Sequence, residues 1–409
     1  MKKIELLAPA GDLEKLKTAI IYGADAVYIG GEKLGLRVAS KNFDDAQMKE
    51  GIEFAHKRGK KVYITCNITA HNDDLDGVDE YFKNLEELGA DALIISDPAF
   101  VQIAKESVPN MELHLSTQAN TTNYMTAKFW QSQGISRIVA ARELSIQELA
   151  KIKEKCPDLE LEMFVHGAMC MSYSGRCLIS NFMTGRDANK GECAQPCRWN
   201  YSLMEEKRPG EYFPVEQDER GTYFFNSKDL CLIGNVKEII EAGIDSMKIE
   251  GRVKTAYYVA TVVRAYKMAI DAYYKDPQNY KFDEKWLEDV SKASHRNFTD
   301  GFFHKEQTND TVNLQNYSTS SYIRTYDVVA IVKDFDEQKN MAKVVQKNKF
   351  LKGDEVEIIG PNFATQKAII NKIISEKGEQ LEQSNVPMQE VFIDVGMKID
   401  KDFMIIKQL

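Results

Sequence analysis

Five of the seven cysteines of this 409-residue chain lie in one polar, turn-rich stretch; they are Cys170, Cys177, Cys193, Cys197 and Cys231. Their neighbours are Gly, Ser, Asn and Arg, in segments too irregular to belong to a core. The other two, Cys66 and Cys156, lie within or beside apolar runs, where a free cysteine acts as a small hydrophobic residue. The clustering therefore indicates thiolate ligation or redox chemistry.

The spacing of these cysteines limits the kind of metal centre. Paired CxxC knuckles, typical of a zinc ribbon, are absent, so a structural zinc site matches poorly. Four thiolates from loops of unequal length suit an iron–sulfur cluster better. We predict that four of the five cysteines bind one metal centre, and the alternative is a set of inert buried thiols.

Composition places the chain among globular proteins. It is 43% hydrophobic with a formal net charge of −9, which argues against a broad nucleic-acid-binding surface and leaves a local basic pocket open. The first residues have no signal-peptide pattern, and no segment is long and apolar enough to span a membrane. Clustered cysteines without such a signal predict a protein of the reducing cytoplasm.

The elements that must position the cysteines follow a repeating βα pattern over residues 1–275. Eight strand-like runs start near Ile4, Ala26, Lys61, Ala92, Glu112, Arg137, Leu161 and Ser246. Amphipathic segments separate them, and the phrase helix–Gly–Ala/Ile–Asp–strand recurs. This pattern predicts a closed (β/α)8 TIM-like barrel with a Cys-rich insertion at 166–231. A doubly wound open sheet is the alternative, but APAGDLE after the first strand is not a phosphate loop.

The pattern changes after residue 275. Residues 276–321 read as a helical extension and a Ser/Thr/Asn-rich linker. Residues 322–409 hold short alternating runs split by turns, which predict a small C-terminal all-β barrel domain.

Polar residues follow several predicted strands, and the loops after barrel strands meet at one face that carries the chemistry. These residues are Asn67, His71, Ser116, Thr117, Gln118, Arg142, Glu143, His166, Glu250 and Arg252. A single Glu or Arg there is about as often a cap or a rim ion pair as a substrate ligand. His114, mid-strand, is predicted to be a hydrogen-bonded interior histidine, and His56 a solvated helix end.

Several segments together resemble the peptidase U32 (collagenase-like peptidase) family. They are EMFVHGAMC, SGRCLIS, LLAPAGDLEKLKTAIIYGADAVYIGG, GECAQPCRW, SKDL and IEGR, and they cover the barrel from end to end. By layout the chain is similar to the tRNA hydroxylation protein P group within that family. That resemblance implies 5-hydroxyuridine formation at the tRNA wobble position, prephenate as a required metabolite, and a 4Fe–4S cluster. It also raises a second family member as a hetero-oligomer partner.

By the same resemblance, the cluster ligands are Cys170, Cys177, Cys193 and Cys231, with Cys197 as the alternative ligand. The segment LGLRVAS departs from the family pattern around Arg37. Candidates for binding substrate phosphates or a dicarboxylate metabolite are Arg37, Gln118, Arg142, Arg198 and Arg252. The catalytic candidates are His71, Glu162, His166 and Glu250.

Two other functions compete with RNA modification. A peptidase would follow the family label, but HExxH, GxSxG and Cys–His protease signatures are absent. A metalloprotease built from His71, Glu162 and His166 would leave the cysteines unexplained. The third possibility is a cluster-bearing scaffold or electron carrier for a partner.

Overall fold

Eight short apolar strands form the inner ring of the protein. The computed structural model describes residues 3–36, 42–170, 172–173, 176–199, 202–204, 212–214, 227–304 and 322–409. They are β1 (Glu5–Pro9), β2 (Ala26–Gly30), β3 (Lys61–Cys66), β4 (Ala92–Ile95), β5 (Glu112–Leu115), β6 (Arg137–Val139), β7 (Glu160–Ala168) and β11 (Ser246–Ile249). Each pairs in parallel with its neighbour, and β11 pairs with both β1 and β7. The ring is therefore closed, which confirms the predicted barrel and excludes the open doubly wound sheet.

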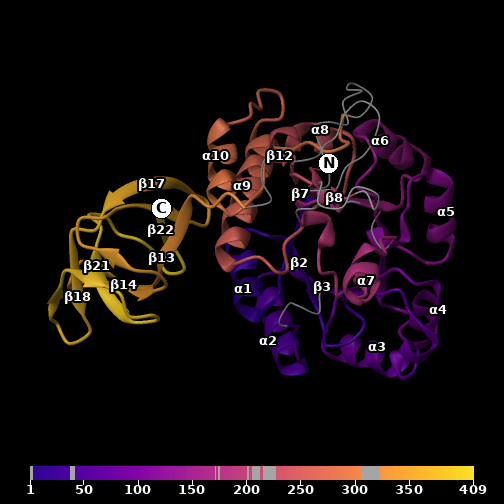
Figure 1. The fold of residues 1–409 in the computed structure, drawn as a ribbon, viewed down its shortest axis with the longest axis horizontal. Helices are drawn as coiled ribbons and strands as arrows, with labels where there is room; N and C mark the ends of the chain where they lie inside the picture. Colours follow the sequence, from indigo (N-terminus) through magenta and orange to yellow (C-terminus); the bar gives the residue numbers. More distant parts are fainter. Residues whose placement is uncertain are drawn as a thin grey trace.

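Helices pack around the barrel strands (Figure 1). They are α1 (Leu13–Ile21), α2 (Asp45–His56), α3 (Val78–Glu87), α4 (Pro98–Ser107), α5 (Tyr124–Ser132), α6 (Ile146–Lys155), α8 (Val236–Glu241), α9 (Ala256–Lys275) and α10 (Glu284–Lys292). Polar side chains cap several of their first turns; Ser145 and Glu148, for example, form a capping box at α6. In the described ranges, no helix combines the length and apolarity that crossing a bilayer requires.

The recurring helix–Gly–Ala/Ile–Asp–strand phrase fixes three strands to their neighbours. Its glycine ends the helix in the left-handed region, as at Gly23 with φ 112°. Its aspartate accepts a backbone N–H from the adjacent strand; the pairs are Asp25 with Leu6 (3.2 Å), Asp91 with Val62 (2.7 Å) and Asp245 with Leu161 (2.9 Å). Each carboxylate also pairs with a basic side chain, from Lys60, His56 and Lys153 respectively. The phrase therefore holds the register between neighbouring strands as well as ending a helix.

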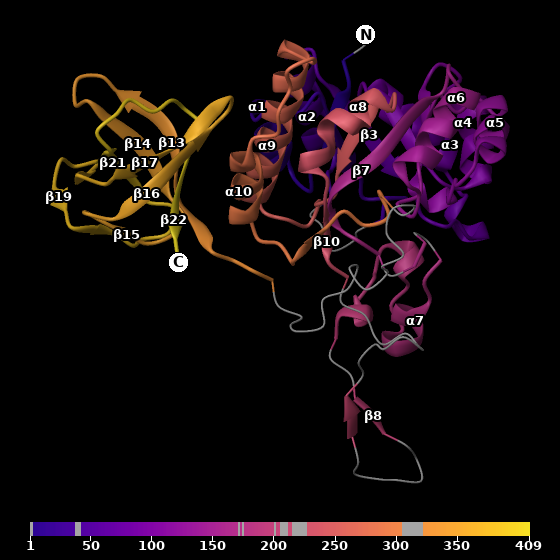
Figure 2. The same ribbon diagram turned by 90° about the horizontal axis from the view of Figure 1, so that it is seen from above.

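The seventh strand runs beyond the barrel and anchors the Cys-rich segment. Its last residues pair antiparallel with β10 (Asp229–Cys231), which pairs in parallel with β12 (Phe298–Thr299). The segment between β7 and β10 holds α7 (Ile179–Thr184) and the two-stranded pair β8 (Ser202–Met204) and β9 (Tyr212–Pro214). Figure 2 shows it projecting from one end of the barrel. This end is where the barrel strands finish, so it is the mouth at which TIM-barrel sites form.

The C-terminal residues form an all-β domain, as predicted. Its antiparallel sheet has the order β17 (Phe363–Ile369), β16 (Glu355–Gly360), β22 (Met404–Gln408), β13 (Tyr326–Asp336), β14 (Met341–Gln346), β21 (Glu390–Asp394), β18 (Lys372–Ser375) and β19 (Gln380–Leu381). A smaller pair joins β15 (Phe350–Leu351) to β20 (Gln383–Ser384). The domain has its own core, with Val344, Ile358 and Ile393 fully buried.

The C-terminal domain packs against α9 and α10 of the barrel (Figures 1 and 2). Ile359, Met404 and Ile406 belong to the barrel's apolar core cluster. The fully buried guanidinium of Arg264 on α9 pairs with Asp289 on α10 and donates to the Phe363 carbonyl at 3.0 Å. These contacts join the two domains through apolar packing and through a hydrogen bond from a buried arginine that an aspartate of the barrel domain holds in place.

Candidate active site

A cavity of about 230 Å³ opens at the C-terminal mouth of the barrel. Strand ends form one side, and the Cys-rich segment forms the other. Seven polar residues predicted from the strand ends line it: Asn67, Ser116, Thr117, Gln118, Arg142, Glu250 and Arg252. The structure therefore brings together side chains from β3, β5, β6 and β11 that lie far apart in the sequence.

Two arginines are held rigidly in the cavity wall. Arg142 donates to the Ala168 carbonyl at 2.6 Å, lies 3.4 Å from a Glu250 carboxylate oxygen, and stacks its guanidinium 3.8 Å from the Phe164 ring centre. Arg252 is buried and donates to Thr65 Oγ1 at 3.0 Å. A Cβ on Gly30 would stand 2.2 Å from Arg252 Nη1, so only glycine leaves room for this side chain.

A buried lysine forms part of the cavity floor. Lys248 Nζ lies 2.7 Å from Glu162 Oε1 and over the ring of Tyr28. Burial alone would raise the pKa of Glu162, but the charges of Lys248 and Arg137 outweigh it and hold that pKa below its usual value. Glu162 therefore stays ionised beneath the cavity and holds the Lys248 ammonium in position.

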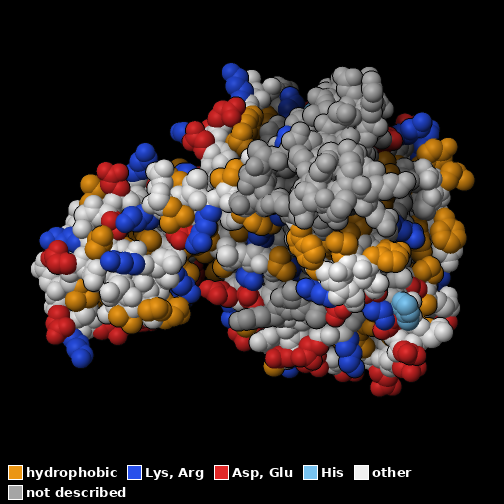
Figure 3. All heavy atoms as spheres, viewed as in Figure 1, with side chains coloured by type: hydrophobic (Ala, Val, Ile, Leu, Met, Phe, Trp, Pro, Cys, Tyr) orange, Lys and Arg blue, Asp and Glu red, His pale blue; other side chains and the backbone are white. Residues whose placement is uncertain are grey.

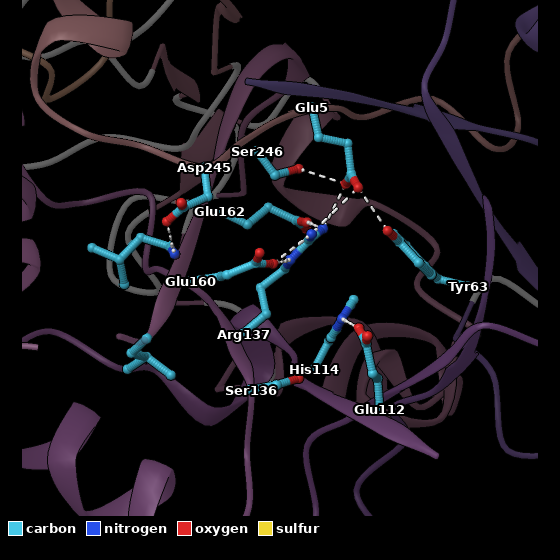
Figure 4. Close-up of polar contacts among 12 residues, drawn as sticks. Glu5, Tyr63, Glu112, His114, Ser136, Arg137, Glu160, Glu162, Asp245 and Ser246 are labelled. Atoms are coloured by element: carbon cyan, nitrogen blue, oxygen red, sulfur yellow. Dashed lines mark hydrogen bonds and ion pairs between the residues drawn. The ribbon is translucent and has the colours of Figure 1, made fainter. Parts of the chain in front are cut away.

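The ion network continues toward the N-terminal end of the barrel, as Figure 4 shows. Arg137 is its centre and contacts three carboxylates: Glu5 at 2.5 Å, Glu160 at 2.7 Å and Glu162 at 3.2 Å. Tyr63 donates to Glu5 at 2.7 Å. The network fills the barrel interior with satisfied charges, so Glu162 supports the cavity from below and does not line it.

The cysteines divide into two groups. Cys170, Cys177, Cys193 and Cys197 all line the cavity. Cys231, in β10, does not; burial raises the pKa of its thiol to about 12, and its side chain contacts Tyr266 on α9. In the described ranges, no three Cys, His, Asp or Glu side chains already stand in a metal-binding arrangement.

The donor chemistry around the cavity nevertheless suits a thiolate-bound group. Four cysteines that line one cavity supply the ligand type of iron–sulfur and zinc centres. The predicted set of Cys170, Cys177, Cys193 and Cys231 stays a prediction. The alternative ligand Cys197 is the one that lies with the other three.

The predicted histidines lie away from the cavity. His166 is buried against Tyr258, Tyr266 and Phe298, and burial lowers its pKa to about 3. His71 is exposed at the turn before Asn72–Asp74. Arg37 and the side chain of Arg198 lie outside the described residues. Of the four catalytic candidates, only Glu250 is thus a cavity residue.

Sequence reasoning missed four residues that shape the cavity: Tyr28, Lys248, Lys254 and Tyr322. Lys248 falls within SMKI, where alternation places it on the same side as Ser246 and Glu250, so the strand's period could have identified it. Lys254 lies 4.0 Å from the Tyr322 ring centre, and burial lowers its pKa. Tyr322 comes from the start of the C-terminal domain, which no local pattern places at the mouth.

The arrangement provides a binding site for a small anionic or hydrogen-bonding ligand. Arg142, Arg252 and Lys248 supply positive charge, and Phe164 and Tyr28 supply apolar surface. Gln118 Oε1 is buried and has no hydrogen-bond partner in the described part of the chain, so it offers an acceptor to a ligand. This combination of a few convergent polar groups with apolar walls is typical of ligand sites.

Comparison with known proteins identifies the family of this chain. The model of peptidase family U32 matches residues 11–313, and that of the peptidase family U32 C-terminal domain matches residues 324–405. The chain belongs to peptidase family U32.

Particular relatives match along most of the chain. It is 43% identical over 398 residues to tRNA hydroxylation protein P1 of Bacillus subtilis (strain 168), covering 97% of this chain and 93% of that protein. It is 39% identical to tRNA hydroxylation protein P of Escherichia coli (strain K12), covering 88% and 87%. A second Bacillus subtilis protein, tRNA hydroxylation protein P2, is 35% identical and covers 75% and 99%.

Proposed function

We propose that this protein is an RNA-modifying enzyme that hydroxylates the wobble uridine of tRNA to 5-hydroxyuridine. The observation that carries the proposal is the joint presence of near full-length similarity to tRNA hydroxylation proteins and a basic, cysteine-lined cavity at the barrel mouth. A base must leave its stack to enter such a cavity, and an anticodon base is already single-stranded, which lowers the cost of flipping. The proposal places the protein in the cytoplasm.

The cavity residues have distinct roles in this proposal. Gln118 Oε1 accepts the ring N–H of uracil, because it is a buried acceptor without a partner among the described residues. Arg142 and Arg252 bind carboxylate or phosphate oxygens, including those of prephenate as the required dicarboxylate metabolite. Lys248 holds positive charge at the floor while Glu162 fixes its position.

An iron–sulfur cluster, of the 4Fe–4S type, is proposed as a redox group, which would supply one-electron transfer at the mouth when bound. Cys170, Cys177 and Cys193 are proposed ligands, with Cys231 as the fourth by family pattern and Cys197 as the alternative that the cavity favours.

The peptidase alternative gains no support from the site. The described residues that line the cavity include serines and cysteines but no histidine that could act as their general base. His166, the nearest in sequence, is buried on another side of β7 against α9. A scaffold or electron carrier would not need a cavity that can hold a nucleobase. It would also not need a buried acceptor such as Gln118 Oε1, which has no hydrogen-bond partner among the described residues.

A second family member is the proposed protein partner. Bacillus subtilis has both a P1 and a P2 tRNA hydroxylation protein, and both are similar to this chain. Co-purification of a tagged chain from its own cells, followed by mass spectrometry, tests this point.

Nucleoside mass spectrometry of tRNA from a deletion strain tests the function. We expect 5-hydroxyuridine and its derivatives to disappear, to return with the wild-type gene, and to stay absent with Cys170→Ala or Arg142→Leu. Unchanged tRNA in the deletion strain would reject the proposal.

The cluster is tested separately by iron, sulfide and spectroscopic analysis of anaerobically purified Cys→Ala variants at all five positions. Four variants should lose the cluster and one should keep it. A wild-type protein that contains zinc and no sulfide would reject the cluster.

A further inference from the structure

The short helix α7 has two faces with different surroundings. Ile179 and Ser180 line the cavity, and Ser180 Oγ accepts the Ala194 N–H at 2.9 Å, which ties the helix to the segment after Cys193. Large apolar side chains on the helix and beside it are open to solvent. We call Leu178, Phe182, Met183 and Trp199 the α7 patch; they are 54%, 83%, 51% and 45% exposed. Figure 3 shows hydrophobic side chains gathered over this region.

Basic residues flank the α7 patch. Arg176 precedes the helix, Arg186 follows it, and both are exposed. Neither forms an ion pair within the part of the chain that the structure describes. By sequence, residues 170–199 carry four basic and two acidic residues, whereas the whole chain has a formal net charge of −9. Positive charge is thus concentrated beside the cavity mouth of an acidic protein.

We propose that the α7 patch is an RNA-stacking surface that holds the unpaired nucleotides next to the target base. The ring of Phe182 stacks on a neighbouring base, Trp199 extends the apolar platform, and Arg176 and Arg186 bind the flanking phosphates. The inference rests on the proposed function and extends it to the residues that hold the anticodon loop at the mouth.

Three observations favour single-stranded RNA over a protein partner. The most exposed side chain is aromatic, and single-stranded bases bind proteins by stacking on aromatic rings. Exposed arginines, Arg176 and Arg186, flank the helix in the sequence on both sides, and arginine is a common ligand of nucleic-acid phosphates. The same helix lines the cavity through Ile179 and Ser180, so the patch lies beside the mouth that the target base must enter.

Binding of the full-length, anaerobically purified protein to unmodified tRNA from a deletion strain tests this proposal. Phe182→Ala should weaken binding roughly five- to 150-fold, the loss of one base–aromatic stack. Phe182→Trp should retain binding and Phe182→Leu should lose it, because stacking needs a ring and an apolar protein contact does not. Phe129→Ala, which removes another exposed phenylalanine on the distant helix α5, is the matched control and should bind normally.

Salt dependence gives a second readout. Replacing Arg176 or Arg186 by Gln should lower the slope of log affinity against log salt concentration by about 0.7 each. Sedimentation of every variant reports the oligomeric state. Unchanged tRNA affinity in Phe182→Ala and Phe182→Leu would overturn the stacking surface, and a change of oligomeric state at unchanged affinity would assign the patch to a protein partner. Either result leaves 5-hydroxyuridine formation by the wild-type chain intact, so failure here is distinct from failure of the proposed function.

Discussion

At the scale of single residues, charge placement inside the barrel explains the cavity. Lys248 carries positive charge at the floor, and its only carboxylate contact in the described residues is Glu162. Arg137 shares that carboxylate and is itself surrounded by Glu5 and Glu160. Buried charges are tolerated when they are paired and hydrogen-bonded, so each acidic group here has a definite structural purpose. The sequence marked Glu162 as a catalytic candidate because it cannot show that the side chain points below the cavity.

We expect Glu162→Gln to destabilise the protein by about 3–5 kcal/mol, because it leaves Lys248 uncompensated and removes one partner of Arg137. Urea unfolding measures the change. Glu160→Gln is the matched control at the partly exposed edge of the same network and should cost clearly less. Equal effects of the two substitutions would contradict the assignment of Glu162 as the central counter-charge.

His114 makes stability depend on pH. Burial lowers its pKa below the ordinary 6.5, and Arg137 adds to the effect while Glu112 opposes it. As pH falls, His114 therefore binds a proton near pH 6.5 in the unfolded chain but only at a lower pH in the native protein. The stabilisation is complete above pH 6.5 and is lost as pH falls, by up to about 1.4 kcal/mol per pH unit.

Urea unfolding at pH 7.5 and 5.5 checks this effect in wild type and His114→Gln. The wild type should lose more stability between the two pH values than the variant, which has no proton to bind at this position. Identical losses would show that His114 does not contribute to the pH dependence.

At the scale of elements, local signals in the sequence were sufficient to predict the barrel. Each βα unit carries its own apolar strand and helix, and several of the helices end at a glycine, so all eight strands could be recognised from short windows. The antiparallel pairing of β10 with the end of β7 has no such local signal. This pairing places Cys231 and His166 on the side of α9, away from the cavity. The sequence could therefore group five cysteines but could not separate Cys231 from the other four.

The recurring aspartate of the βα phrase should contribute measurably to stability. Asp245→Ala removes the acceptor of the Leu161 N–H and the partner of Lys153, and we expect a loss of about 1–3 kcal/mol. Asp245→Asn keeps an acceptor oxygen and should cost less. Glu154→Ala, at an exposed ion pair, serves as the control and should change the unfolding free energy by under about 0.5 kcal/mol. If Asp245→Ala changes the unfolding free energy no more than Glu154→Ala does, the helix–Gly–Ala/Ile–Asp–strand phrase only ends the helix.

At the scale of the whole molecule, the C-terminal domain contributes directly to the site. Tyr322, at its start, lines the cavity and contacts Lys254, and the pairing of His295 with Ile323 fixes this segment to the barrel. The short alternating runs predicted the β-domain as a separate unit, because this pattern is visible within each strand. Its docking surface depends on side chains of α9 and α10 that contact strands about 100 residues later in the sequence. Contacts between residues so far apart in the sequence produce no recurring residue pattern from which they could be predicted.

Docking of the two domains should depend on Arg264. Its guanidinium is fully buried, pairs with Asp289, and donates to the Phe363 carbonyl at 3.0 Å and Thr365 Oγ1 at 2.8 Å. Arg264→Leu leaves the Asp289 carboxylate buried with less compensation, so we expect a loss of about 3–5 kcal/mol. Hydrogen exchange should rise in β17, which meets Arg264, and stay low in β18 at the far side of the sheet. Arg324→Leu, at an exposed pair with Asp327, is the control and should leave β17 and β18 protected from hydrogen exchange. If Arg264→Leu leaves β17 equally protected, apolar packing alone holds the domains together.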